Sequence, residues 1–123
     1  MRPHTLSRGE RLRGTKIIGL LFRNGMEFTI PPLKIKVIHH PQPESPHQVL
    51  FSVPRKLHPK ATHRNRIKRL MREAYRLNKS ALEGLPSLCI AYIYQSKQVP
   101  AFQEITQAIV QLLSMLRNYA QKN

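Results

Sequence analysis

The chain has 123 residues and a formal net charge of +15, because 21 Lys and Arg residues face only six carboxylates. Hydrophobic residues make up 41% of it, which excludes a disordered tail, and no run approaches the roughly 18 apolar residues of a membrane-spanning helix. A charge this large opposes the compact state through self-repulsion, so it predicts a polyanionic partner, and nucleic acid fits best.

Residues 1–14 are basic and poor in apolar side chains, which predicts a flexible basic arm. No apolar stretch of signal-peptide type follows these basic residues, so we expect a cytoplasmic protein. The remaining pattern predicts a single nucleic-acid-binding domain over residues 15–119 and a short C-terminal tail over 120–123.

The first predicted helix spans residues 15–24, with Thr15 as its N-cap and Gly25 after its last turn. Helical spacing places one set of side chains toward the core: Ile17, Leu20, Leu21 and Asn24. Ile18 and Phe22, four residues apart, form a second apolar line. That line fits either core packing or an exposed shelf on which bases stack.

Two segments with alternating apolar residues follow the first helix. After a short extended piece at 26–30 and Pro31-Pro32, the strand at 33–39 points Lys34 and Lys36 away from the core. A proline-rich loop at 41–47 leads to a second strand at 48–53. This loop is too short for a crossover, so we expect the two strands to be antiparallel.

The longest predicted helix runs from Thr62, as N-cap, to Gly84, with an apolar stripe along one face. The stripe consists of Ile67, Leu70, Met71, Ala74, Leu77, Asn78, Ala81 and Leu82. The opposite face is basic and carries Asn65, Lys68, Arg69, Arg72, Arg76 and Lys79, flanked by Arg64 and Arg66.

Charge spacing distinguishes this helix from an ordinary solvated one. Solvated faces intersperse Glu with Lys four residues apart, whereas here Lys68, Arg72 and Arg76 repel one another at that spacing and only Glu73 interrupts them. An external polyanion relieves this repulsion, so the basic face is predicted to bind nucleic acid. Arg55 and Lys56, just upstream, extend the basic surface.

The last two elements are a strand at 88–94 and an amphipathic helix at 102–118. Tyr92 and Tyr94 share one face of that strand and fit either a base-stacking surface or the core. The long helix can carry a crossover into this strand. The element order therefore predicts an α+β fold of two layers, with one sheet covered by helices.

Residues for hydrolysis are scarce. The six acidic residues are all Glu, scattered singly along the chain, whereas a nuclease with two metal ions needs several converging carboxylates. The six histidines lack metal-finger spacing, and Cys89 lies in an apolar run typical of a buried thiol. We therefore predict no catalytic residue and no metal ligand in this chain; cutting groups would belong to a partner.

The segment Phe51-Ser-Val-Pro-Arg-Lys56, followed by Ala61-Thr-His-Arg-Asn-Arg-Ile-Lys-Arg-Leu-Met-Arg-Glu-Ala-Tyr75, resembles the bacterial ribonuclease P protein component. Arg11-Leu12 and Leu21-Phe-Arg-Asn-Gly25 resemble it too, so the likeness covers most of the chain. The resemblance implies a ribosomal-protein-S5-domain-2-like fold of order αββ(β)αβα, with a left-handed crossover through the long helix against the general rule.

The same resemblance implies a function. In that family the protein subunit binds a catalytic RNA and the 5′ leader of precursor tRNA, and the RNA subunit with bound Mg²⁺ removes the leader. We expect the protein alone to be monomeric. The alternative is a structural RNA-binding protein of ribosomal type, while a helix-turn-helix DNA binder is disfavoured by the strand that ends near Val53.

The resemblance also assigns residues. Those matching its arginine-rich RNA-binding motif are Arg64, Asn65, Arg66, Lys68, Arg69 and Arg72, to which we add Arg76, Arg55 and Lys56 for their charge. The predicted leader-binding cleft comprises Phe22, Ile18, Lys34, Lys36 and Tyr92. Ile18 stands where the family often has Phe, Lys36 where some members have Tyr, and Tyr92 where Arg is frequent.

Overall fold

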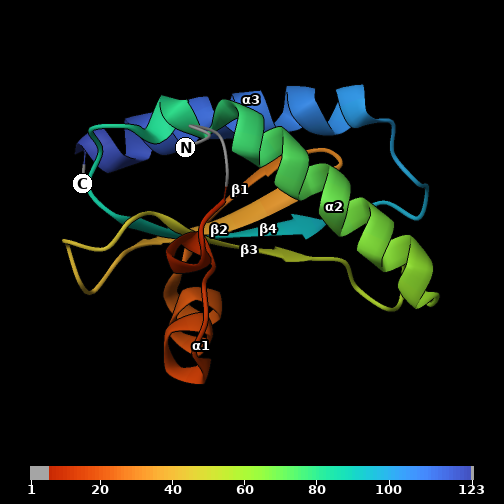
Figure 1. Ribbon diagram of the computed structural model, residues 1–123, viewed down its shortest axis with the longest axis horizontal. Coiled ribbons are helices and arrows are strands. Elements are labelled where there is room, and N and C mark those ends of the chain that lie inside the picture. The colour runs from red at the N-terminus through yellow and green to blue at the C-terminus, as the bar shows by residue number, and fades with distance from the viewer. Residues whose placement is uncertain (1–5, 123) are drawn as a thin grey trace.

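The computed structural model describes residues 6–122, which form an α+β fold with a four-stranded sheet (Figure 1). The helices are α1 (Thr15–Asn24), α2 (Ala61–Asn78) and α3 (Phe102–Lys122), and the 3₁₀ turns are η1 (Arg8–Glu10) and η2 (Lys79–Leu82). The strands are β1 (Met26–Ile30), β2 (Leu33–His39), β3 (Gln48–Ser52) and β4 (Leu88–Tyr94). Helices α2 and α3 cover one face of the sheet and α1 lies against the other, which confirms the predicted α+β class with a sheet covered by helices.

The strand order is β1-β2-β4-β3. β2 runs antiparallel to both β1 and β4, while β3 runs parallel to β4, so β2 and β3 are antiparallel in direction as predicted. They are not neighbours, however, because β4 lies between them. α2 connects β3 to its parallel neighbour β4 and is therefore the expected crossover; its left hand and the S5-type label remain predictions.

The main core lies between the sheet and the α2/α3 layer. It takes alternate residues of each inner strand, among them Leu33, Ile35 and Val37 of β2, as the period-two pattern predicted. A smaller cluster under α1 contains Leu12, Leu21, Cys89 and Ala91. Burial raises the pKa of the Cys89 thiol to about 11, so this thiol stays protonated and is a packing residue.

The predicted helix boundaries need correction. Lys60 caps α2 by its backbone, and Thr62 lies inside the first turn instead of capping it. The helix ends at Asn78 and continues as η2 before Gly84, whose φ of 81° is the left-handed conformation predicted for a glycine there. In α1, Leu21 is the buried residue and Asn24 is exposed, so the predicted core face of that helix is narrower than expected.

Both predicted terminal segments pack against the domain over the residues that the structure describes. Leu12 is only 6% exposed, and its N–H donates a hydrogen bond of 2.9 Å to the Val49 carbonyl of β3. α3 continues through the predicted tail as far as Lys122 and buries Ala120. Residues 1–5 and 123 lie outside the description. Between residues 6 and 122, no helix has the length and apolar character needed to cross a bilayer.

Candidate nucleic-acid interface

The basic side of α2 has the exposure that the sequence predicted. Asn65, Arg66, Arg69 and Arg72 are exposed, and Lys68 is half-buried. No ion pair joins these cations to a carboxylate within the described part of the chain. The repulsion between Lys68 and Arg72 is therefore not relieved by a carboxylate of the described chain, and these side chains stay available to phosphates.

Two arginines of the predicted set are already engaged with the protein itself. Arg64 donates hydrogen bonds of 3.0 and 2.7 Å to the carbonyls of His58 and Pro59, which close the turn before α2. Arg76 pairs with Glu73 one turn earlier, and this hydrogen-bonded pair raises the pKa of Arg76 and lowers that of Glu73. We therefore expect both to contribute less to phosphate binding than Arg69.

The loop that enters α2 extends the basic side. Arg55 and Lys56 are exposed there, and the buried His58 anchors the loop through a 2.7 Å hydrogen bond between its Nε2 and the Ser96 carbonyl. Arg55 and Lys56, which are predicted to bind RNA, therefore lie in a loop that is anchored to the domain.

Two further arginines, Arg11 and Arg13, lie beside Arg72 in a groove of about 440 Å³ that the sequence reasoning missed. Leu6, Leu12, Val49, Leu50 and Phe51 complete its lining, and the Arg72 guanidinium lies 5.9 Å from the centroid of the Phe51 ring. The sequence signal that could have revealed this groove is Leu12 between two arginines, because a buried Leu12 holds both arginines in place.

The sheet face toward α1 carries most of the predicted leader cleft. Lys34 and Lys36 of β2 point to this face because their neighbours Leu33, Ile35 and Val37 point into the core. The Lys36 ammonium donates a 2.8 Å hydrogen bond to the Phe22 carbonyl of α1, while the Lys34 ammonium lies 3.8 Å from Glu27. Ile18 is half-buried and Phe22 is 37% exposed.

Tyr92 does not belong to this cleft, which corrects the prediction. It lies opposite Ile35 and Phe51 in the register of β4, so it faces α2, and it is 0% exposed. Its ring stacks on Phe51 at 5.6 Å. The residues of β4 on the cleft face are Ala91 and Ile93, which pair with Lys36 and Lys34.

Tyr94 also packs in the core, where it is 1% exposed and its hydroxyl donates a 2.5 Å hydrogen bond to the Gln98 carbonyl. Of the two predicted alternatives, a base-stacking surface or the core, both tyrosines of β4 therefore belong to the core.

Comparison with known proteins fits this geometry. The family model described as Ribonuclease P matches residues 6–117. The ribonuclease P protein component of Chlorobium phaeobacteroides is 36% identical, over 93% of this chain and 89% of its own length. That of Chlorobaculum tepidum is 34% identical, over 95% of this chain and 84% of its own length. The chain belongs to the bacterial ribonuclease P protein family.

Solved structures agree with this membership in a ribonuclease P protein family. The ribonuclease P protein of Thermotoga maritima superposes with a TM-score of 0.71 and 26% identity, covering 85% of this chain and 94% of its own. A Staphylococcus aureus ribonuclease P protein gives the same TM-score at 21% identity, covering 87% of this chain and 94% of its own, and shows the shared fold.

The buried Tyr92 hydroxyl of this ribonuclease P protein has no hydrogen-bond partner among residues 6–122. Replacing it with hydrogen in Tyr92→Phe keeps the packing and removes an unpaired polar group, so the free energy of unfolding is expected to rise by about 1 kcal/mol. The matched variant Tyr94→Phe loses its bond to Gln98 and is expected to be destabilised by about 1 kcal/mol. Urea unfolding of both variants measures the contrast, and a destabilised Tyr92→Phe would show that the hydroxyl has a partner after all.

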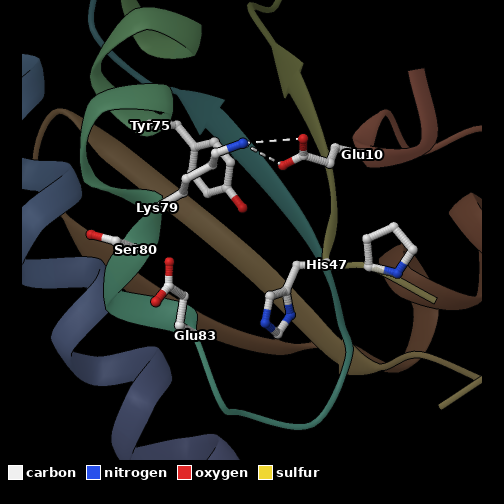
Figure 2. A pocket seen from close by; sticks show the side chains of 7 residues that line it. Glu10, His47, Tyr75, Lys79, Ser80 and Glu83 are labelled. Carbon is white, nitrogen blue, oxygen red and sulfur yellow. Dashed lines mark hydrogen bonds and ion pairs between the residues drawn. The ribbon is translucent and has the colours of Figure 1, made fainter. Parts of the chain in front are cut away.

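A pocket of about 320 Å³ lies where η1, the end of α2 and the 41–47 loop meet (Figure 2). The Lys79 ammonium reaches the Glu10 carboxylate at 2.8 Å, with both side chains largely shielded from solvent. Burial raises the pKa of Glu10, but hydrogen bonds from Lys79 and Ser7 outweigh it and the pKa is lowered. These contacts join the N-terminal segment to η2, the turn that follows α2, so this side of the pocket is a structural joint.

His47 forms the other side of this joint. Its Nδ1 accepts a 3.1 Å hydrogen bond from the Leu88 N–H, so Nε2 carries the proton and donates to the Leu82 carbonyl at 2.9 Å. Burial lowers the pKa of His47 below 6.5, although the Leu82 carbonyl and the charge of Glu10 oppose this shift. Protonation of Nδ1 would break the bond to Leu88.

The stability of the protein is therefore expected to fall as the pH drops below 6.5. In that range the unfolded chain takes up a proton on His47 that the folded protein does not, until the pH reaches the lowered pKa. Unfolding free energies measured from pH 7.5 to pH 5.5 should show this loss. His47→Asn, which keeps an acceptor for Leu88, should be less stable at pH 7.5 and lose less stability on acidification; an equal loss would assign the dependence to another group.

Proposed function

We propose that this chain is the protein subunit of ribonuclease P, which binds the catalytic RNA and the 5′ leader of precursor tRNA and promotes removal of the leader. The observation that carries the proposal is the exposed basic side of α2, where Arg66, Arg69 and Arg72 have no carboxylate partner in the described chain. Family membership supports an association with ribonuclease P RNA.

The chemistry of these residues suits the binding of RNA and not its hydrolysis. Lys and Arg neutralise phosphates and release counterions, which gives affinity without reading sequence, as a protein that serves many precursors requires. Within residues 6–122 no three His, Cys, Asp or Glu side chains gather to hold a metal ion. The proposal therefore gives hydrolysis, and the Mg²⁺ that supports it, to the RNA subunit.

The cleft face of the sheet is the proposed leader surface. Phe22 offers an exposed aromatic ring, and Lys34 lies on the same face of β2 as Lys36. Single strands are held by basic grooves with stacking side chains, at about 1 to 3 kcal/mol per stacked base. Ile18 adds apolar area beside Phe22, whereas Tyr92 is outside the proposal because it is buried on the other face.

Reconstitution tests the proposal. The purified protein is mixed with a bacterial ribonuclease P RNA at low Mg²⁺, and the rate of leader removal from a precursor tRNA is measured. We expect clear stimulation over the RNA alone, because the protein supplies contacts that the RNA lacks. RNA binding without stimulation would instead support the ribosomal-type alternative, and sedimentation of the protein alone checks the proposed monomer.

A further inference from the structure

Lys36 makes contacts that a simple phosphate-binding lysine would not make. Its ammonium donates a 2.8 Å hydrogen bond to the carbonyl of Phe22, in the last turn of α1. The same ammonium lies over the Phe22 ring, 5.9 Å from its centroid. One side chain of β2 thus holds both the backbone and the ring of the residue proposed to stack on the leader.

α1 ends directly against Lys36. The helix stops at Gly25, whose N–H donates a 2.8 Å hydrogen bond to the Leu21 carbonyl. A Cβ at Gly25 would lie 3.2 Å from the Cβ of Lys36, so the end of the helix and β2 are in close contact. The Phe22 carbonyl is one of the last-turn acceptors that no further helical N–H can satisfy, and Lys36 supplies the missing donor.

The anchoring of α1 elsewhere is modest. Leu21 is its buried side chain, and the cluster beneath the helix contains few residues compared with the main core. Phe22 itself is 37% exposed and would otherwise be free to change rotamer. An exposed aromatic side chain binds a base more tightly when it is already held in the bound orientation.

We propose that Lys36 is the positioning residue of the leader surface: it fixes the last turn of α1 and holds the Phe22 ring in one orientation for a leader base. This inference rests on the proposed function. A cation over one ring face also strengthens the contact, since the ammonium is attracted to the negative face of the ring. Lys36 therefore acts through Phe22, whereas Lys34 on the same face lies 3.8 Å from the Glu27 carboxylate.

The experiment compares precursor tRNA with mature tRNA, using the protein assembled with ribonuclease P RNA. The ratio of the two dissociation constants measures the gain in affinity that the leader provides. We expect Phe22→Ala to reduce this gain about fivefold, which corresponds to the lower end of a stacked base's contribution. Lys36→Met, which keeps an unbranched stem for packing, is expected to reduce it by a similar factor, and Lys36→Arg to restore it.

Two further measurements separate positioning from charge. In the Phe22→Ala background, Lys36→Met should cost no additional leader-dependent affinity, since both variants remove the same interaction. Lys36→Met should show the same salt dependence of binding as Lys97→Met. The second variant removes an equal charge from an exposed loop outside the leader surface. Circular dichroism confirms that each variant retains its helices.

The possible failures are distinct. If Phe22→Ala leaves the leader-dependent gain unchanged, the leader surface and the positioning role both fall. If Phe22→Ala reduces the gain and Lys36→Met does not, the leader surface stands and the positioning role is wrong. If Lys36→Met instead weakens both ligands equally and lowers the salt slope by about 0.7, Lys36 is a phosphate contact and the inference is overturned.

Discussion

Arg69→Ala is expected to raise the dissociation constant of the protein for ribonuclease P RNA about tenfold at moderate salt, as the loss of one charge-assisted contact implies. Arg69 is exposed and has no carboxylate partner in the described chain, so its guanidinium breaks no ion pair when it binds a phosphate. The slope of log K against log salt should fall by about 0.7 to 0.9, one phosphate-equivalent. Arg72→Ala should behave alike.

The control for this prediction lies on the same helix. Arg76→Ala removes the same charge from a guanidinium already paired with Glu73, so its effect on the salt slope is expected to be less than half as large. Titrations of each variant at several salt concentrations measure the slopes. Unchanged slopes for both Arg69→Ala and Arg72→Ala would show that the basic side of α2 is not the RNA contact.

The long helix was predictable because its signals are local. Ile67, Met71 and Ala74 recur at helical spacing and are all buried, whereas Leu77 and Ala81 of the predicted stripe are exposed. The basic residues fall on the other side of the helix. Tyr75, outside the predicted stripe, is also buried, since its ring packs beside Tyr92. The helix start was misplaced because Lys60 caps it by backbone alone and leaves no side-chain signal.

The placement of Tyr92 was not predictable because all seven residues of β4 are buried and the strand has no polar alternation. Which of its faces meets α2 is decided by the register with β2 and β3, two segments distant in sequence. The partners of Arg64 could not be predicted for a related reason. They are backbone carbonyls of a turn whose geometry appears only after folding.

Gly25 lies where the end of α1 meets β2, and the reason for glycine here is steric. Its φ of −67° and ψ of 141° are accessible to any residue, so backbone freedom is not the reason for glycine here. A Cβ would lie 2.4 Å from the Leu21 carbonyl oxygen and 3.2 Å from a side-chain carbon of Leu21. The Cβ of Lys36 is 3.2 Å away on the strand side, so the added methyl cannot be accommodated without shifting the last turn of α1 beside β2.

Gly25→Ala is therefore expected to lower the free energy of unfolding by about 1 to 3 kcal/mol, the usual cost of forcing extra volume into a packed contact. Gly9→Ala is the matched control, because its added Cβ would have no neighbour closer than 3.8 Å. Urea unfolding of the two variants gives the comparison. Because a displaced α1 also breaks the bond between Lys36 and the Phe22 carbonyl, Gly25→Ala should reduce the leader-dependent gain as Lys36→Met does. Equal stabilities for the two alanine variants would show that α1 shifts without cost, and the close contact with β2 would then not be what holds Phe22 in place.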